Sequence, residues 1–331
     1  MTRKATSELT TKKVSMGDKI KGFHLKYRPQ PNPDNTDWLS WLSSYSLPGI
    51  LIISTLSIFA FWNTLDNGFV WDDQSIIVAN KAIRKLSLSN IGDFFTSKDV
   101  YNFAAGDIYR PLSILSYAFE YRLYGLDSTG YHLTNLIIHT LNSILVYLTI
   151  GLILKERLIA FVTSLLFVVH PIHTEAVAWV KERDELLALL FFLLALYFYI
   201  RRSFNPQGSG QTLRPASTSP YILALLFYIL ALLSEEMAIT LPFILILHDA
   251  CFSVNRMRRP KDWLAYLPFF FISGIYLIVR TIVIGQVGQT DYIGGGFLPA
   301  IYTTVKGVVY YIKLLILPIN LCADYLTFPI S

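Results

Sequence analysis

Two adjacent carboxylates, Asp72 and Asp73, follow the first long apolar segment of the chain, and Trp71 precedes them. An Asp-Asp pair in a loop is often solvated surface. A carboxylate can also take a proton from a hydroxyl group as a general base, and one of two neighbouring acids can orient while the other accepts the proton. We therefore treat both residues as candidate catalytic groups.

Other ionisable side chains lie near the ends of apolar segments, where such groups merit a functional hypothesis. Arginine has a planar fork that suits two phosphate oxygens. Arg110 and Arg280 could instead contact lipid headgroups, and a histidine inside an apolar segment could simply pack there. We expect the following residues to bind substrate: Arg110, His132, His170, His173, Glu175, Glu182, Arg183, Glu235, Glu236 and Arg280.

Metal chemistry has weaker support in the sequence. His170, His173 and Glu175 could bind a divalent metal, but Pro171 makes regular helical spacing across the two histidines unlikely to hold. Cys251 and Cys322 are far apart and indicate neither a disulfide framework nor a zinc site. The sequence has neither a phosphate-binding loop motif nor a Gly-x-Ser-x-Gly elbow, so we assign no metal and no cofactor.

The elements that position these residues are apolar. The 331 residues are 53% hydrophobic and 15% charged, with a mean hydropathy of +0.46, which is typical of an all-α integral membrane protein. Runs near 20 apolar residues can cross a bilayer. We expect spans near 47 to 64, 133 to 154, 158 to 170, 185 to 200, 220 to 234, 237 to 250 and 263 to 284. An eighth segment, 298 to 321, could cross or lie in the interface.

The distribution of charge predicts the orientation. Lysine and arginine are more numerous in residues 1 to 46 and the alternate loops, and basic loops stay in the cytoplasm. Residues 1 to 46 are thus predicted to be a mobile cytoplasmic tail, and residues 47 to 331 a membrane domain. The net charge of +5 reflects this topology and needs no nucleic-acid partner to explain it.

This orientation places the polar clusters on the outer side, with Asp291 and, if 298 to 321 lies flat, Asp324 and Tyr325. The first outer loop, 65 to 130, is long enough to have its own structure, and 109 to 126 suits an interfacial helix. In the second span, polar side chains three or four residues apart share one face and should bond to other helices. They are His132, Asn135, His139 and Asn142.

A succession of motifs resembles the transmembrane and tetratricopeptide-repeat O-mannosyltransferases, which are GT-C class glycosyltransferases related to the dolichyl-phosphate-mannose protein mannosyltransferases. The motifs are Phe69-Val-Trp-Asp-Asp73, Tyr109-Arg-Pro-Leu112, Gly130-Tyr-His-Leu-Thr-Asn135, His170-Pro-Ile-His-Thr-Glu-Ala-Val-Ala178, Ser234-Glu-Glu236 and Leu321-Cys-Ala-Asp-Tyr325. The resemblance implies a GT-C-like multi-span bundle with a long structured first outer loop. It also implies transfer of a sugar, mannose in this family, from a polyprenyl-phosphate donor to a hydroxyl of a protein or another acceptor outside the cytoplasm, with Asp72 or Asp73 as the base.

Two departures from the family pattern concern sugar and acceptor preference. Glu235-Glu236 replaces the family's Lys-Glu, and Glu182-Arg183 replaces its Gly-Arg. We find no 34-residue repeat, and the chain stops at Ser331, before the further spans and repeats of the family, which predicts a fragment or a short version. The membrane would be the plasma membrane of a prokaryote or the endoplasmic reticulum of a eukaryote. The alternative function is a non-catalytic membrane protein that binds or transports a lipid-linked substrate.

Overall fold

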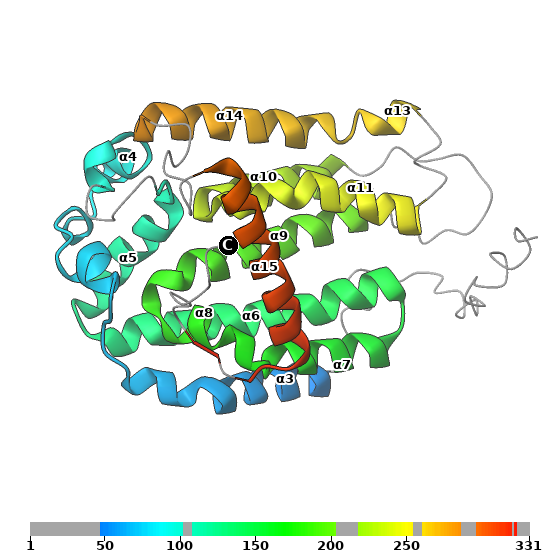
Figure 1. Cartoon of the computed structure of the whole chain (residues 1–331), viewed down its shortest axis with the longest axis horizontal. Coiled ribbons are helices and arrows are strands. Elements are labelled where there is room, and N and C mark those ends of the chain that lie inside the picture. The colour runs from blue at the N-terminus through cyan, green and yellow to red at the C-terminus, as the bar shows by residue number, and fades with distance from the viewer. Residues whose placement is uncertain are drawn as a thin grey trace, which may run out of the picture.

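The computed structural model describes residues 47–101, 108–202, 218–253, 260–285, 296–319 and 321–322. Helices and turns account for the architecture of this part of the chain, and strands are absent from it (Figure 1). The predicted all-α membrane class is confirmed. The tail, Asp291, Asp324 and Tyr325 lie outside the described residues.

The main helices run roughly side by side (Figure 1). Helix α6 is in the middle, between α7 and α3 on one side and α9 on the other, and α10 packs on α9. Their bounds are α3 Leu47–Phe61, α6 Ser128–Leu154, α7 Arg157–Val168, α9 Arg183–Arg201, α10 Thr218–Ser234, α11 Leu241–Phe252, α13 Pro260–Trp263 and α14 Leu267–Ile284. Each predicted span thus coincides with a helix, with ends that differ by a few residues.

Three helical stretches in the described part are long and apolar enough to cross a bilayer: Leu47–Asp66, Ser128–Leu154 and Pro260–Ile284. A bent pair, Arg157–Val168 with Pro171–Ala178, would make a fourth, and Ser219–Ser234 is apolar but shorter. The total of seven or eight spans stays a prediction.

The bent pair is broken at Pro171, where the two parts differ in direction by 48°. Proline has no backbone N–H to donate and disfavours a helical residue before it, and His170 is accordingly extended. A short turn, η5 (Pro171–His173), and one helical turn, α8 (Thr174–Ala178), follow. Such a break leaves backbone carbonyl groups without partners, and in a membrane these must be satisfied within the protein.

The polar face of α6 bonds to a carbonyl group at this break and to two carbonyl groups in the segments that follow. The His139 Nε2 atom lies 3.1 Å from the carbonyl oxygen of Val168, at the end of α7. Asn135 Nδ2 donates to the carbonyl of Trp179 at 3.1 Å. Asn142 Nδ2 donates to Leu186 O in α9 at 2.9 Å. The predicted packing role of this face is therefore confirmed, and it explains why a membrane helix carries these side chains.

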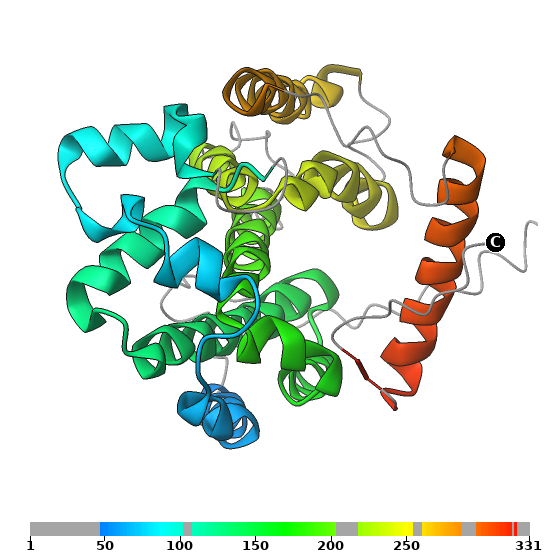
Figure 2. The ribbon, with the colours of Figure 1, turned by 60° about the vertical axis from the view of Figure 1, so that its left-hand side comes forward.

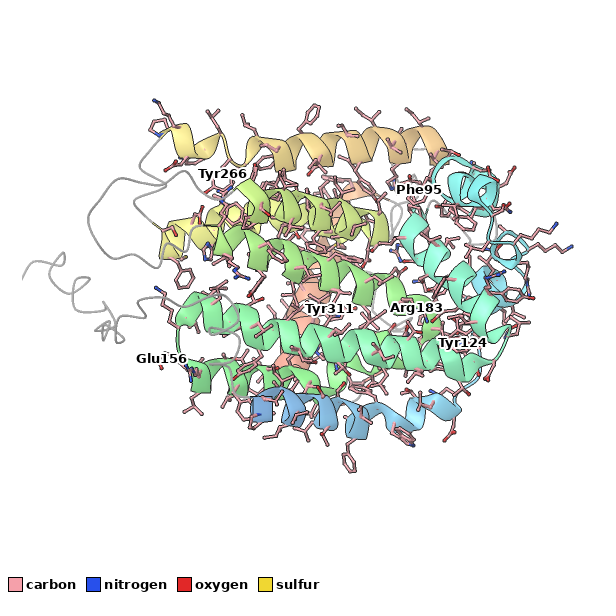
Figure 3. All side chains as sticks on the ribbon, turned by 180° about the vertical axis from the view of Figure 1, so that it is seen from behind. Phe95, Tyr124, Glu156, Arg183, Tyr266 and Tyr311 are labelled. Carbon is pink, nitrogen blue, oxygen red and sulfur yellow. The ribbon has the colours of Figure 1, made fainter. Side chains whose placement is uncertain are left out.

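The described parts of the predicted first outer loop, residues 65–101 and 108–130, form turns and helices of their own. They contain the short turns η1 (Trp62–Asp66), η2 (Gln74–Val78), η3 (Ala82–Arg84) and η4 (Lys98–Val100), and the helices α4 (Leu88–Thr96) and α5 (Pro111–Tyr124). Helices α4 and α5 cover one end of the bundle, which we call the loop end (Figure 1). Figure 3 shows Arg183 and Tyr124 at this end, with Glu156 and Tyr266 at the opposite end.

Helix α15 (Phe297–Ile316) lies apart from the other helices. It is steeply inclined to the bundle in Figure 1 and stands at its side in Figure 2. Leu314 is the one residue buried in this helix. The arrangement favours the interfacial alternative for this segment over a further span.

Candidate functional site

Asp72 and Asp73 have opposite environments. Asp73 is fully buried, and its two carboxylate oxygens accept hydrogen bonds from the backbone N–H groups of Val70 at 3.0 Å and Lys181 at 2.8 Å. Burial raises the pKa of Asp73 to about 6, although the two N–H groups act in the opposite direction. Asp72 is exposed, and among the described residues its carboxylate has no hydrogen-bond or ion-pair partner. Only Asp72 is open to a substrate.

The segment from Trp179 to Glu182 is held against the Asp-Asp loop from several directions. Lys181 N donates to Asp73, as described. The Tyr117 hydroxyl, from α5, donates to the carbonyl oxygens of Val180 at 3.2 Å and Lys181 at 3.1 Å. Together with the bond from Asn135 to Trp179 O, these contacts fix the segment that connects α8 to α9.

Arg110 ties three parts of the chain together. It precedes α5 and forms ion pairs with Asp184 at the start of α9, with Glu235 Oε1 at 3.2 Å and with Glu236 Oε2 at 3.5 Å. Burial opposes the charge of Arg110, but the three carboxylates outweigh it and raise its pKa. Burial raises the pKa of Glu235 to about 7 against the opposite effect of Arg110. These contacts surround the Arg110 guanidinium with three protein carboxylates, although its Nε atom lies within ion-pair distance of Glu236 without a hydrogen bond.

Arg183 has no face open to a substrate. Its side chain is fully buried in an ion pair with Glu120. Its Nε donates to Asn135 Oδ1 and its Nη2 to Tyr131 O, both at 2.8 Å. The Tyr117 ring lies 4.8 Å from the guanidinium carbon. Arg183 therefore acts as an internal tie in this arrangement, in place of the predicted substrate contact.

His132 is also fully buried, on α6, and so lies where the packing alternative placed it. His170 is engaged through both ring nitrogens. Its Nδ1 accepts from Ile172 N at 3.2 Å, so its Nε2 donates to Leu315 O of α15 at 3.1 Å. His170 thus connects the helix break to α15.

The remaining candidates lie around two cavities. A cavity of about 460 Å³ separates the helix break from α15, and it is lined by Val70, Trp71, Pro171, Ile172, Thr174, Glu175, Ala178, Trp179, Tyr311, Leu314, Leu321 and Cys322. Trp71 and Trp179 contact each other edge to face, with ring centroids 5.1 Å apart. Glu175 is exposed there and is the one ionisable carboxylate or base in the lining. Asp72 follows Trp71 in sequence but is not itself one of the lining residues.

The second cavity, of about 400 Å³, lies on the other side of α8. Its polar lining residues are His139, His173, Glu185 and Glu235, and its apolar ones come from α7, α8, α9 and η7 (Glu236–Thr240). Glu182 lines neither cavity and pairs with Lys181 Nζ at 2.7 Å. Arg280 lies in α14 near its loop end and lines neither cavity.

The structure therefore brings together three of the four predicted outer loops. Sequence reasoning missed several residues that hold them: Glu120, Lys181, Asp184 and Trp179. A usable signal was present for two of them, because Lys181 and Asp184 belong to the charged run that precedes the apolar part of α9.

His170, His173 and Glu175 are the residues at which the sequence allowed a metal site. Within the described ranges the structure contains no group of three or more His, Cys, Asp or Glu side chains placed to hold a metal ion. Both ring nitrogens of His170 also form hydrogen bonds with backbone groups.

Comparison with known proteins gave no matching family model and no matching solved structure. Curated proteins do match. The chain is 33% identical to "Protein O-mannosyl-transferase Tmtc1" of Drosophila melanogaster over 223 residues, which are 66% of this chain and 25% of that protein. It is 35% identical to "Protein O-mannosyl-transferase TMTC1" of Homo sapiens over 217 residues, 64% of this chain and 24% of that protein.

A longer match, 28% identical over 295 residues, is to "Protein O-mannosyl-transferase F38B6.6" of Caenorhabditis elegans, and it covers 85% of this chain and 40% of that protein. The chain spans about a quarter of the length of the fly and human relatives. The family predicted from the motifs is confirmed: over about two-thirds of its length, this chain is a homologue of the TMTC protein O-mannosyl-transferases.

Proposed function

We propose that this protein is a GT-C type membrane glycosyltransferase that moves mannose from a polyprenyl-phosphate donor to a hydroxyl group of a protein. The reaction takes place at the loop end, which faces away from the cytoplasm, as the predicted cytoplasmic tail requires. The names of the relatives support mannose and a protein acceptor. The apolar helices support a donor that is held in the bilayer.

The observation that carries the proposal is the difference in solvent exposure between the Asp72 and Asp73 carboxylates. Asp72 is exposed and directly follows Trp71, a lining residue of the 460 Å³ cavity, whereas Asp73 is buried and both of its oxygens accept hydrogen bonds from backbone N–H groups. A general base must reach the proton that it takes. Asp72 meets this requirement, and Asp73 positions the loop that presents it.

In the proposed reaction the acceptor oxygen attacks the anomeric carbon of the donor sugar. Its proton passes to the Asp72 carboxylate and a new carbon–oxygen bond forms. The bond between the anomeric carbon and the phosphate oxygen breaks, and its electron pair leaves with the polyprenyl phosphate. This single displacement inverts the configuration at the anomeric carbon.

The leaving phosphate needs a cation, since developing charge is stabilised by groups placed in advance. Arg183 is enclosed, and Arg110 is engaged by three carboxylates. Arg280 is half-buried near the loop end of α14. Its contact with the donor phosphate stays a prediction from the sequence.

The test compares Asp72→Asn with Asp66→Asn, an exposed acid in the same loop. Both variants and the wild type are reconstituted in vesicles and assayed for transfer from mannosylphosphoryl polyprenol to an acceptor peptide. Loss of a general base should lower the rate of Asp72→Asn by about 10²- to 10⁴-fold. Asp66→Asn should match the wild type.

Donor binding is measured in parallel. Asp72→Asn should bind the donor as the wild type does, because an amide preserves the shape of the carboxylate. Full transfer activity in Asp72→Asn would refute the assignment of the base. A wild type that binds the donor and transfers nothing would instead establish the non-catalytic alternative.

A further inference from the structure

Two tryptophans from distant parts of the chain form one wall of the 460 Å³ cavity. Trp71 comes from the first outer loop and Trp179 from the segment after α8, and their rings meet at an angle of 85°. A volume of this size lies in the range of small-ligand pockets. The lining is largely apolar, and Glu175 and Thr174 contribute polar side chains to it.

Trp71 has an unusual backbone. Its φ angle is +45°, in the left-handed region that large side chains rarely adopt. The conformation is held by the turn that follows, in which Gln74 N donates to Trp71 O at 3.1 Å and Gln74 Nε2 donates to Phe69 O at 3.1 Å. Such strained residues tend to occur at functional sites. Here the strain directs a large aromatic ring, 57% exposed, next to Asp72.

Trp179 contributes its ring to this wall. Its indole nitrogen is closed to solvent, so the N–H group does not face the cavity. The Lys181 Nζ atom lies 5.4 Å from the centre of the Trp179 ring, but Lys181 does not line the cavity.

We propose that Trp71 and Trp179 form a subsite for the hexose ring of the donor. The apolar C–H face of a pyranose is flat enough to lie on an indole ring. Its hydroxyl groups at the ring edge can bond to Glu175 and Thr174, which line the same cavity. The identity of the ligand as the donor sugar rests on the proposed function. The position of the subsite rests only on the residues that line the cavity.

The cavity suits the sugar better than the phosphate. Its lining among the described residues has one acid and no lysine or arginine, so an anion would find repulsion there. A neutral ring with an apolar face and hydrogen-bonding edges matches both parts of the lining. A hexose on Trp71 would lie against the residue that directly precedes Asp72, the proposed base.

The experiment measures the affinity of the full chain in detergent for two probes: a short-chain mannosylphosphoryl polyprenol and the same polyprenyl phosphate without sugar. Trp71→Leu keeps an apolar side chain and the same backbone demand but removes the aromatic ring. Trp71→Phe keeps a smaller aromatic face. Trp62→Leu is the control, because Trp62 is 62% exposed and lines neither large cavity.

The wild type should prefer the sugar-bearing lipid. Trp71→Leu should lower affinity for that lipid by about three- to tenfold, as expected for loss of one aromatic contact, and leave the sugar-free lipid unchanged. Trp71→Phe should keep most of the preference, and Trp62→Leu all of it. An equal loss for both lipids, or no loss for either, would overturn the subsite.

The two proposals fail in different ways. A wild type that prefers the sugar-bearing lipid through Trp71 but transfers no sugar would refute the proposed function and leave the subsite standing. A wild type that transfers sugar, with a Trp71→Leu variant of unchanged preference, would refute the subsite alone.

Discussion

Asp73 and Lys181 are 108 residues apart in the sequence, and in the fold the Asp73 Oδ1 atom accepts a hydrogen bond of 2.8 Å from the backbone N–H of Lys181. The other oxygen accepts from Val70 N, within the same loop. One carboxylate thereby closes its own turn and fastens it to the segment after α8. Asp72, Trp71 and Trp179 owe their relative positions to this link.

The first prediction concerns the strength of the link. In Asp73→Ala both N–H groups lose their acceptor, so we expect a loss of about 1–3 kcal/mol relative to the wild type. Asp73→Asn keeps one amide oxygen as an acceptor and should be more stable than Asp73→Ala. Thermal unfolding in detergent at about pH 4, where the contribution of Asp73 to stability is largest, measures both, with Asp66→Asn as control. Equal melting temperatures for the wild type and Asp73→Ala would contradict the link.

The second prediction follows from the raised pKa of Asp73. Its folded-state pKa of about 6 exceeds the ordinary 3.8, so the native state binds this proton more tightly than the unfolded chain does. The contribution of Asp73 to stability is therefore largest at low pH and decreases as the pH rises from 3.8 to about 6. The total change is on the order of 3 kcal/mol.

Asp73→Asn has no proton to lose at this position and provides the reference. Between about pH 4 and pH 6, the melting temperature of the wild type should fall relative to that of Asp73→Asn. The comparison cancels the titration of the other carboxylates that the two proteins share. A constant difference across this range would show that burial does not raise this pKa.

Local features of the site could be predicted from the sequence. The three- and four-residue spacing of His132, Asn135, His139 and Asn142 fixes one helix face, and that face does bond to other helices. The predicted ends of the helices also lie close to the observed ones, because apolar runs of membrane length are strong signals. The break at Pro171 was indicated by the proline itself.

Long-range pairing could not be predicted. Arg110 meets Asp184 and Glu235, which follow it by 74 and 125 residues, and nothing in local spacing specifies such partners. For the same reason the sequence did not distinguish Asp72 from Asp73. Burial of one and exposure of the other depend on where Lys181 lies in space. Arg183 is an example. Its place in a charged cluster suggested a contact with the donor phosphate, but in the fold its side chain is buried in an ion pair with Glu120.

The third prediction tests that reassignment of Arg183. Arg183→Met removes a buried cation and leaves the Glu120 carboxylate, 4% exposed, without its partner. We expect a loss of about 3–5 kcal/mol, typical of a broken buried ion pair. Arg122→Met, on the exposed face of α5, should leave the melting temperature unchanged. If Arg183→Met unfolds like the wild type but no longer binds the donor, Arg183 contacts substrate after all.

The last prediction concerns the Arg110 cluster. Arg110→Ala leaves Asp184, Glu235 and Glu236 close together without their cation, so we expect a lower melting temperature at about pH 7.5, where carboxylates repel. Loss of Arg110 should also raise the pKa of Glu235 above its value of about 7. A raised folded-state pKa favours the native state as the pH falls, so the defect should shrink at about pH 5.5.

A double variant separates charge repulsion from lost packing. Adding Glu235→Gln to Arg110→Ala removes one negative charge and keeps its shape, so it should recover part of the melting temperature at neutral pH and weaken the pH dependence. Arg122→Ala serves as the control for loss of an exposed arginine. If Arg110→Ala is equally destabilised at both pH values and Glu235→Gln restores nothing, Arg110 holds the loops by packing, and the carboxylates do not depend on its charge.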